Sequence, residues 1–445
     1  MNRQTFISGR SESRIRKTQR WIERMWMFGL LLAALLLFCL NLDSPPLLNG
    51  GEQTINQVAG ELTTTPLASW QWFYPTFGDK SYVEDPPLLY WLIALSYKTG
   101  NDSTWITRLP TALLSALSVP LFYGIGREIF PSRQNALFSS FIYLTVLPVV
   151  QYGRLAIADS AVLCFVMLMM VCLLRSRRDL RWSLTAGIGF ALICLTQGIG
   201  LGLLMLAIGL IFIAWDTPRL LRSGYWWLGW ILGIIPGLVW YTLPWIEGQA
   251  FLTANLIQES IQPFGHSVKI TRTLTGYYDY LLEFLKFSVP WLLFASYGLG
   301  LAWTHRNWGW AKFVLVWTGV YGGAVCLSLI GSPLSAYSLP IYPALALAGG
   351  AQLAAVWNSP RSQSYPRLWI LGLSLMSLGA IAATVYFLLE ASGSLLPVVS
   401  SSVALTFAIA AILVARRDLQ FIFILFWGMY VSLLLLMTSP HWIVS

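Results

Sequence analysis

The sequence predicts an all-α protein that crosses a membrane many times, and three observations carry that prediction. Of its 445 residues, 56% are apolar and only 11% are charged, whereas a soluble domain has about a quarter charged residues. Apolar runs of roughly 20 residues recur, the length of a helix that crosses a bilayer. Lys and Arg gather between alternate runs. A soluble enzyme, a nucleic-acid-binding module, a disordered chain and a β-barrel with alternating strands are thereby excluded.

About thirteen apolar runs are long enough to be predicted spans. They lie near residues 25–42, 109–126, 136–150, 159–174, 182–195, 199–215, 226–246, 280–303, 311–330, 336–357, 368–389, 397–414 and 419–437. The polar residues 1–24 precede the first run and carry seven Lys or Arg residues. Because no small-residue cleavage site follows that run, we expect it to stay as a span behind a cytoplasmic basic tail.

The basic residues predict the orientation of the spans, because cytoplasmic loops are enriched in Lys and Arg. If residues 1–24 are cytoplasmic and the spans alternate, about three quarters of the 28 Lys and Arg residues fall on the cytoplasmic side. An odd number of spans then places the C-terminus outside. We therefore expect one integral membrane domain over residues 1–445, N-in and C-out, without a separate soluble C-terminal domain. The net charge of +9 then needs no nucleic acid partner.

Two predicted outer segments, 43–108 and 247–279, are much longer than turns, and long loops are usually functional. The first contains Glu52 to Leu62, whose apolar residues follow the period of an amphipathic helix on the membrane surface. Glu52 stands at its N-terminus, where the helix dipole favours a carboxylate. The apolar stretch Pro86 to Tyr97 is too short to span and indicates an interfacial or re-entrant helix.

Glycines inside the predicted spans indicate close helix packing. Gly229, Gly233 and Gly237 repeat at intervals of four residues, which brings one face of a helix near its neighbour's backbone. This pattern needs no further role.

Ionisable residues near the outer ends of the spans are the candidates for function, since charges beside lipid are costly. They come from three outer segments that could converge on one pocket. The candidates are Glu52, Glu84, Asp85, Arg154, Asp159, Glu259, His266, Lys269 and Arg272.

The same segments carry a resemblance to a known family. The motifs are YVEDPPLLYWL, GRLAIADS, the turn LTQG, LPW, NLIQES with a later GH and YY, and SAYSLPIYPALAL, in that order up to about residue 350. Their order and spacing resemble the GT-C membrane glycosyltransferases of the protein O-mannosyltransferase and lipid A aminoarabinose transferase type (glycosyltransferase families 39 and 83). The resemblance implies a GT-C-like helix bundle in the inner membrane with its active face in the periplasm.

The resemblance also implies an inverting glycosyl transfer from a polyprenyl-phosphate-linked sugar to an envelope acceptor. A carboxylate of the first outer loop activates the acceptor, the nucleophile attacks the anomeric carbon, and the polyprenyl phosphate leaves. A positioned base contributes roughly 10²–10⁴-fold in rate, and cations stabilise the charge that grows on the leaving phosphate. The implied partners are the lipid donor, the acceptor and the bilayer.

The implied roles fall on twelve residues of this chain. The catalytic candidates are Glu52 and Asp159; the donor phosphate candidates are Arg154, Lys269, Arg272, Tyr277 and Tyr337; the substrate pocket candidates are Asp85, Glu259 and Tyr278; and Glu84 and His266 are candidates for holding a divalent metal ion.

The chain departs from the family's pattern mostly by losing charge. Gly51 stands where the first acid of an Asp-Glu pair is expected, and Gln197 stands where the LTQG turn should carry a Lys. The remaining departures are Asp85 before the Pro-Pro pair, Gln262 in the second loop, and Gly331 and Pro333 before SAYSLP.

Other interpretations of the same residues stay open at this point. Glu52 could be a solvated helix-start carboxylate, and Arg154 could pair with Asp159 to fix a turn. Glu84 and His266 could be a hydrogen-bonded pair, because zinc sites need three or four ligands. The charged residues of the second loop could form a solvated face, and its tyrosines could belong to an interfacial belt.

Two alternatives to a transferase also remain open for the whole chain. The lost charges favour a catalytically silent relative that binds a polyprenyl lipid or a partner protein. A lipid transporter is less favoured, because the candidate charges gather on one face instead of at mid-membrane.

Overall fold

The computed structural model describes most of the chain. The described residues are 4–48, 50–66, 69–78, 80–82, 86–98, 100, 103–246, 284–329, 336–358, 365–390, 395–440 and 442. Within them the fold is helical except for one two-residue hairpin, and the predicted class, an all-α polytopic membrane protein, is confirmed.

The first part of the chain contains ten elements. They are α1 (Gln4–Cys39), α2 (Gly51–Thr64), η1 (Trp70–Trp72), β1 (Thr76–Phe77), β2 (Lys80–Ser81), α3 (Leu88–Tyr97), α4 (Thr104–Ile129), α5 (Arg133–Thr145), α6 (Leu147–Tyr152) and α7 (Ala158–Ser176). The antiparallel hairpin pairs Thr76 with Ser81 and Phe77 with Lys80.

The second part of the chain contains helices only, as far as the structure describes it. They are α8 (Trp182–Gln197), α9 (Ile199–Asp216), η2 (Pro218–Arg222), α10 (Gly224–Ile246), α13 (Trp291–Thr304), α14 (Gly309–Leu329), η4 (Ala336–Ile341), α15 (Tyr342–Asn358), α16 (Arg367–Glu390), α17 (Leu396–Ala415) and α18 (Gln420–Thr438).

Eight helices in the described part of the chain are long and apolar enough to cross a membrane. They are Thr18–Cys39, Thr104–Ile129, Ala158–Ser176, Ile199–Asp216, Leu339–Asn358, Arg367–Glu390, Leu396–Ala415 and Gln420–Thr438. Each overlaps one of the predicted spans. The total of thirteen stays a prediction, since two further apolar helices of the described chain, Leu88–Tyr97 and Trp182–Gln197, are shorter than a full span.

Two predicted spans are interrupted. The run 136–150 is not one helix, because α5 ends at Thr145 and α6 starts afresh at Leu147 with Pro148 in its first turn. Proline lacks the N–H that would continue the α5 ladder, and Val146 before it is extended. In the run 280–303, α13 likewise begins only after Pro290.

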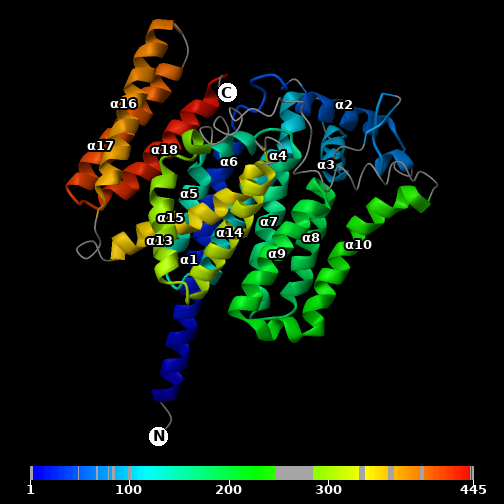
Figure 1. The fold of residues 1–445 in the computed structure, drawn as a ribbon, viewed down its shortest axis with the longest axis horizontal. Helices are drawn as coiled ribbons and strands as arrows, with labels where there is room; N and C mark the ends of the chain where they lie inside the picture. The colour runs from blue at the N-terminus through cyan, green and yellow to red at the C-terminus, as the bar shows by residue number, and fades with distance from the viewer. Residues whose placement is uncertain are drawn as a thin grey trace.

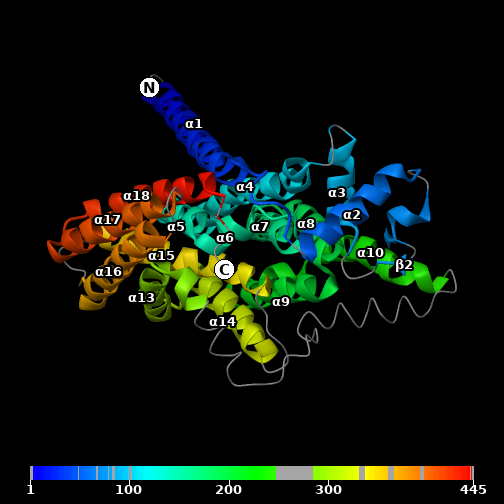
Figure 2. The ribbon, with the colours of Figure 1, turned by 90° about the horizontal axis from the view of Figure 1, so that it is seen from above.

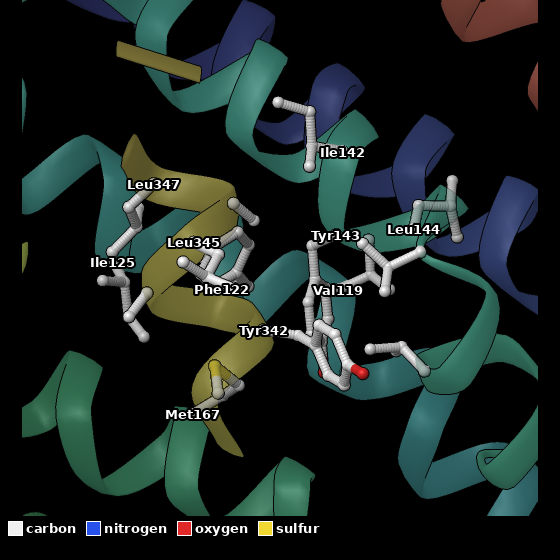
Figure 3. Packing of buried hydrophobic residues seen from close by; sticks show 14 of the residues in the cluster. Val119, Phe122, Ile125, Ile142, Tyr143, Leu144, Met167, Tyr342, Leu345 and Leu347 are labelled. Carbon is white, nitrogen blue, oxygen red and sulfur yellow. The ribbon is translucent and has the colours of Figure 1, made fainter. Parts of the chain in front are cut away.

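The bundle is built from neighbouring helix pairs: α4 with α7, α7 with α8, α8 with α10, α5 with α15, α13 with α15, and α16 with α17. At the centre, side chains of α4, α5, α7 and α15 converge, with Phe122, Tyr143, Met167 and Leu345 among them (Figure 3). The Tyr143 hydroxyl lies 2.9 Å from Ser118 Oγ, so this polar group is satisfied inside the core.

The predicted close packing at the glycines of α10 is confirmed. A Cβ on Gly187 of α8 would lie 1.9 Å from the Gly229 carbonyl oxygen, and one on Gly233 would lie 2.4 Å from the Gly187 oxygen. The two backbones therefore touch directly, which only glycine permits at these positions.

The two ends of the bundle differ. At one end, which we call the basic end, α1 begins and extends beyond the body (Figures 1 and 2). Arginines gather at this end: Arg127 lies in the last turn of α4, Arg133 begins α5, and Arg177, Arg178 and Arg181 follow α7. At the opposite end, the loop end, lie α2, α3 and the C-terminus of the chain (Figure 1).

The amphipathic helix predicted in the first outer segment is confirmed as α2. Its buried residues are Glu52, Ile55, Val58, Ala59 and Leu62. They pack with the buried face of α3, the short apolar helix predicted between Pro86 and Tyr97. Because α2 buries one face, the direction of its first turn is fixed, and Glu52 points into the protein.

Candidate functional site

Glu52 lies at the centre of the loop end, in a fully buried ion pair with Arg108 at the start of α4. Arg108 donates from Nε to Glu52 Oε1 at 2.9 Å and from Nη2 to Oε2 at 2.7 Å. The two side chains are 0% and 1% exposed. This two-pronged geometry is the strong form of an Arg–carboxylate contact.

Backbone groups complete the contacts of Glu52. The N–H of Ala156 donates to Oε1 at 2.8 Å, and the N–H of Leu48 donates to Oε2 at 3.0 Å. Each carboxylate oxygen thus accepts two hydrogen bonds. Glu52 therefore joins α2 to α4, to the segment before α2, and to the turn between α6 and α7.

Arg108 uses its remaining N–H groups on the segment between α1 and α2. Nη1 donates to the carbonyl oxygens of Leu42 and Pro45 at 2.9 and 2.7 Å, and Nη2 also donates to Pro46 at 3.3 Å. Sequence reasoning did not select Arg108. Its position at the first turn of a span is ordinary, and its partners lie more than 50 residues away in the sequence.

Arg154 caps the C-terminus of α1. It is 0% exposed, and Nη1 donates to the Leu37 carbonyl oxygen at 2.8 Å while Nη2 donates to that of Asn41 at 3.1 Å. The carbonyl oxygens of Phe38 and Leu40 also accept from it. These are the carbonyls that a helix end leaves without partners, and a cation there is favoured by the helix dipole.

The charge environment of Arg154 is unusual. Burial, and then the nearby Arg108 charge, lower the pKa of Arg154 to about 9. The guanidinium therefore keeps its charge at neutral pH. Its Nε is buried without a hydrogen-bond partner among the described residues.

Trp442, beyond the end of α18, lies against both arginines. The guanidinium carbons of Arg154 and Arg108 are 4.6 and 5.4 Å from its ring centroid. The ring is 0% exposed, and its Nε1–H donates to the Ser44 carbonyl oxygen.

Asp159 and Arg154 do not form the ion pair that their positions suggested. Asp159, in the first turn of α7, accepts a hydrogen bond from Gln197 Nε2 at the end of α8, whereas Arg154 turns to α1. That expectation was wrong because the α1 carbonyls offer Arg154 several acceptors, and the turn between α6 and α7 directs the two side chains to different helices.

The Asp159–Gln197 pair leaves two oxygens without partners. Within the described residues, no hydrogen bond reaches Asp159 Oδ2, and Gln197 Oε1 is buried with no partner. Asp159 follows Ala156, which holds Glu52, by three residues. Two acceptor oxygens thus stand beside the segment that anchors α2.

An aromatic cluster borders the turn that follows Gln197. The N–H of Ile199 donates to the Tyr241 hydroxyl at 3.2 Å, and Tyr74 stacks on Trp240 at 5.9 Å with an interplanar angle of 13°. Trp240 Nε1 donates to the Phe73 carbonyl oxygen at 3.0 Å. The first outer segment is thereby fastened to the end of α10.

The other predicted site residues lie in η4 or outside the described residues. Tyr337 lies in η4. Those that lie outside the described residues are Glu84, Asp85, Glu259, His266, Lys269, Arg272, Tyr277 and Tyr278. Where the structure does describe the chain, no three His, Cys, Asp or Glu side chains gather as a metal site would require. A metal between Glu84 and His266 stays a prediction.

Comparisons with known proteins agree with this architecture. Residues 84–241 match the model of a family described as dolichyl-phosphate-mannose-protein mannosyltransferase. An undecaprenyl phosphate-alpha-4-amino-4-deoxy-L-arabinose arabinosyl transferase of Pseudomonas fluorescens is 27% identical over 375 residues, 82% of this chain. The corresponding transferase of Aeromonas hydrophila is 23% identical over 350 residues, 76% of this chain.

Solved structures show the same fold. The crystal structure of ArnT from Cupriavidus metallidurans bound to undecaprenyl phosphate has a TM-score of 0.69 at 19% identity, and covers 93% of this chain and 76% of that one. By sequence and fold, this chain is similar to the aminoarabinose transferases.

This chain is shorter than the proteins that it resembles. It spans 66% of the Pseudomonas fluorescens transferase and 62% of the Aeromonas hydrophila one. An archaeal oligosaccharyltransferase of Archaeoglobus fulgidus shares the fold more distantly, with a TM-score of 0.52 at 13% identity, over 93% of this chain and 56% of that one.

Proposed function

We propose that this protein transfers a sugar from a polyprenyl-phosphate-linked donor to an envelope acceptor, with inversion, on the periplasmic face of the inner membrane. The names of its relatives support the donor class, since they act on an undecaprenyl phosphate sugar. The observation that carries the proposal is the Asp159–Gln197 pair, with two oxygens that lack partners among the described residues. Such oxygens are suited to receive the hydrogens of a hydroxyl or amine acceptor.

Asp159 is the candidate base in this proposal. As the acceptor's oxygen or nitrogen attacks the anomeric carbon, its proton passes to Asp159 Oδ2. The bond from the anomeric carbon to the phosphate oxygen breaks, and the polyprenyl phosphate leaves with that electron pair. Gln197 holds Oδ1 through its amide, which fixes the orientation of the carboxylate.

Glu52, the other predicted catalytic carboxylate, has a different role in this proposal. Both of its oxygens already accept two hydrogen bonds, two of the four from Arg108, and a base needs a lone pair that faces the acceptor. We therefore assign Glu52 a positioning role, in which it anchors α2 against α4 and holds the segment leading to Asp159.

The leaving phosphate is assigned to residues of the second outer loop and η4. In our proposal Lys269 and Arg272 balance its charge, with Tyr277 and Tyr337 as hydrogen-bond donors. In the same proposal Asp85, Glu259 and Tyr278 are assigned to the substrate pocket, and Glu84 and His266 would hold a divalent ion. Arg154 can join them only by exchanging the α1 carbonyls that it now caps.

The test is mass spectrometry of polyprenyl-phosphate sugars in a deletion strain that is complemented with variants. One glycolipid should accumulate in the deletion strain and clear with the wild-type protein. It should persist with Asp159→Asn at normal protein level, because loss of a base costs roughly 10²–10⁴-fold in rate. The matched control is Asp43→Asn, an exposed loop-end carboxylate that accepts from the Trp105 N–H at 3.0 Å, and it should clear the glycolipid.

A silent binding protein is the second candidate, favoured by Gly51 at the first acid position and by the neutral Gln197. It predicts a glycolipid pool that does not change on deletion, while the purified protein still binds undecaprenyl phosphate. An unchanged pool would overturn the transferase. Clearance by Asp159→Asn would leave the transferase and remove Asp159 as its base.

A further inference from the structure

Trp442 occupies a place that the proposed reaction does not use. It follows the last span, and its Nε1–H bonds to the carbonyl oxygen of Ser44, 398 residues earlier in the chain. Next to it, Asn41 Nδ2 donates to the Met437 and Thr438 carbonyl oxygens at 3.3 Å. The end of α18 is therefore bound to the segment that joins α1 to α2.

The Trp442 ring contacts both buried arginines, whereas the carboxylate of Glu52 pairs with only one of them. Of the two buried guanidinium groups, that of Arg108 is paired with a carboxylate, Glu52. Arg154 contacts backbone carbonyls, and no ion pair links it to any acid that the structure describes. An indole ring presents a negative face to a cation, and that attraction is strongest where water is excluded.

We propose that Trp442 is a positioning residue for the loop-end site, and that its ring holds Arg154 and Arg108, and through them α2, by cation–π contact. Arg154 links the ring to the end of α1, and Arg108 links it to Glu52 and hence to α2 and Ala156. One side chain thus joins α18, the segment between α1 and α2, and the turn that precedes Asp159.

The first experiment measures hydrogen exchange in the full-length protein in detergent. Trp442→Leu should lower the protection of the α2 amides about tenfold or more, because a desolvated cation–π contact is lost. Trp442→Phe keeps an aromatic face but loses the hydrogen bond to Ser44. Its α2 protection should lie between that of the wild type and that of Trp442→Leu. The matched control is Trp427→Leu on α18, whose side chain is 63% exposed, and it should leave α2 unchanged.

A second experiment separates cation–π contact from packing. Tryptophan with one, two or three ring fluorines is placed at position 442 by stop-codon suppression. Each fluorine weakens the negative face of the ring with little change in its shape, so α2 protection should fall stepwise along the series. A flat series, or unchanged α2 protection in Trp442→Leu, would overturn the inference. The series also decides the matter if Trp442→Leu does not fold.

The catalytic consequence rests on the proposed function and is measured separately. If the protein transfers a sugar, Trp442→Leu should lower kcat about tenfold with a smaller change in KM, because the site is misplaced while the residues assigned to the leaving phosphate are unchanged. If the wild-type protein shows no transfer, the proposed function fails. The exchange measurements still test the role of Trp442.

Discussion

The basic end and the loop end of the bundle use the same charged residue types in opposite ways. At the basic end, Glu23, Glu128 and Asp216 each pair with two cations and stay partly exposed. Their partners are Arg127 and Arg133, Arg175 and Arg178, and Arg177 and Lys312, respectively. At the loop end, one acid and one cation are completely buried, and the second cation has no acid among its described neighbours.

The two sets of ion pairs differ in their exposure to solvent. Water and salt screen the basic-end pairs, so each contributes little to stability although it ties neighbouring helices together. The loop-end pair has no such screening, and the loss of either partner leaves a bare charge in the protein. The basic end therefore tolerates substitution, whereas the loop end depends on each member of its cluster.

The difference between the two ends is tested most directly by removing one arginine at each end. Arg108→Leu should lower the free energy of unfolding by about 3–5 kcal/mol, because Glu52 is left buried without its partner. Arg127→Leu at the basic end should cost about 1 kcal/mol or less. Thermal unfolding of the two purified variants in one detergent measures both, and equal losses would show that burial does not distinguish the ends.

A second substitution tests whether backbone packing, instead of ion pairs, stabilises the helices that begin at the basic end. Gly187→Val places a side chain where the Gly229 carbonyl oxygen lies, and overpacking of this kind costs about 1–3 kcal/mol or more. Its matched control, Gly300→Ala, meets nothing within 4 Å and should be neutral or slightly stabilising in a helix. Unfolding midpoints that do not separate the two would contradict the backbone contact of α8 with α10.

The smallest effect is the response to salt. Raising NaCl from about 0.05 to 0.5 M shortens the screening length severalfold, so the stability difference between wild type and Glu23→Gln should shrink from at most about 1 kcal/mol toward zero. The difference between wild type and Arg108→Leu should change little, because the Glu52–Arg108 pair is shielded from ions. A parallel salt dependence in the two variants would argue against that shielding.

The sequence was enough for the fold class and for α2. Length and apolarity identify a membrane helix without any tertiary information, and the period of Ile55, Val58 and Leu62 identified a half-buried helix. It was less informative where proline interrupts an apolar run, as at Pro148, since composition does not reveal whether a helix bends or restarts.

The site was predictable in part, and its partners were not. Glu52 and Asp159 stood out as acids beside lipid, and both lie at the loop end. Arg108 and Trp442 carried no local signal, because their contacts join residues far apart in the chain. The wrong pairing of Arg154 with Asp159 has a related cause, since a carbonyl acceptor at a helix end leaves no mark in the sequence.

The contact between α1 and α18 joins two helices that are synthesised at different times. The Tyr430 hydroxyl donates to the Ala33 carbonyl oxygen at 2.9 Å, across 397 residues of chain. At 5–20 residues per second, roughly 20–80 s pass on the ribosome between these two residues. During that time the side of α1 that contacts α18 has no such partner. In contrast, α2 and α4 can already form their ion pair. The packing of α1 is therefore completed by a helix that is made long after it.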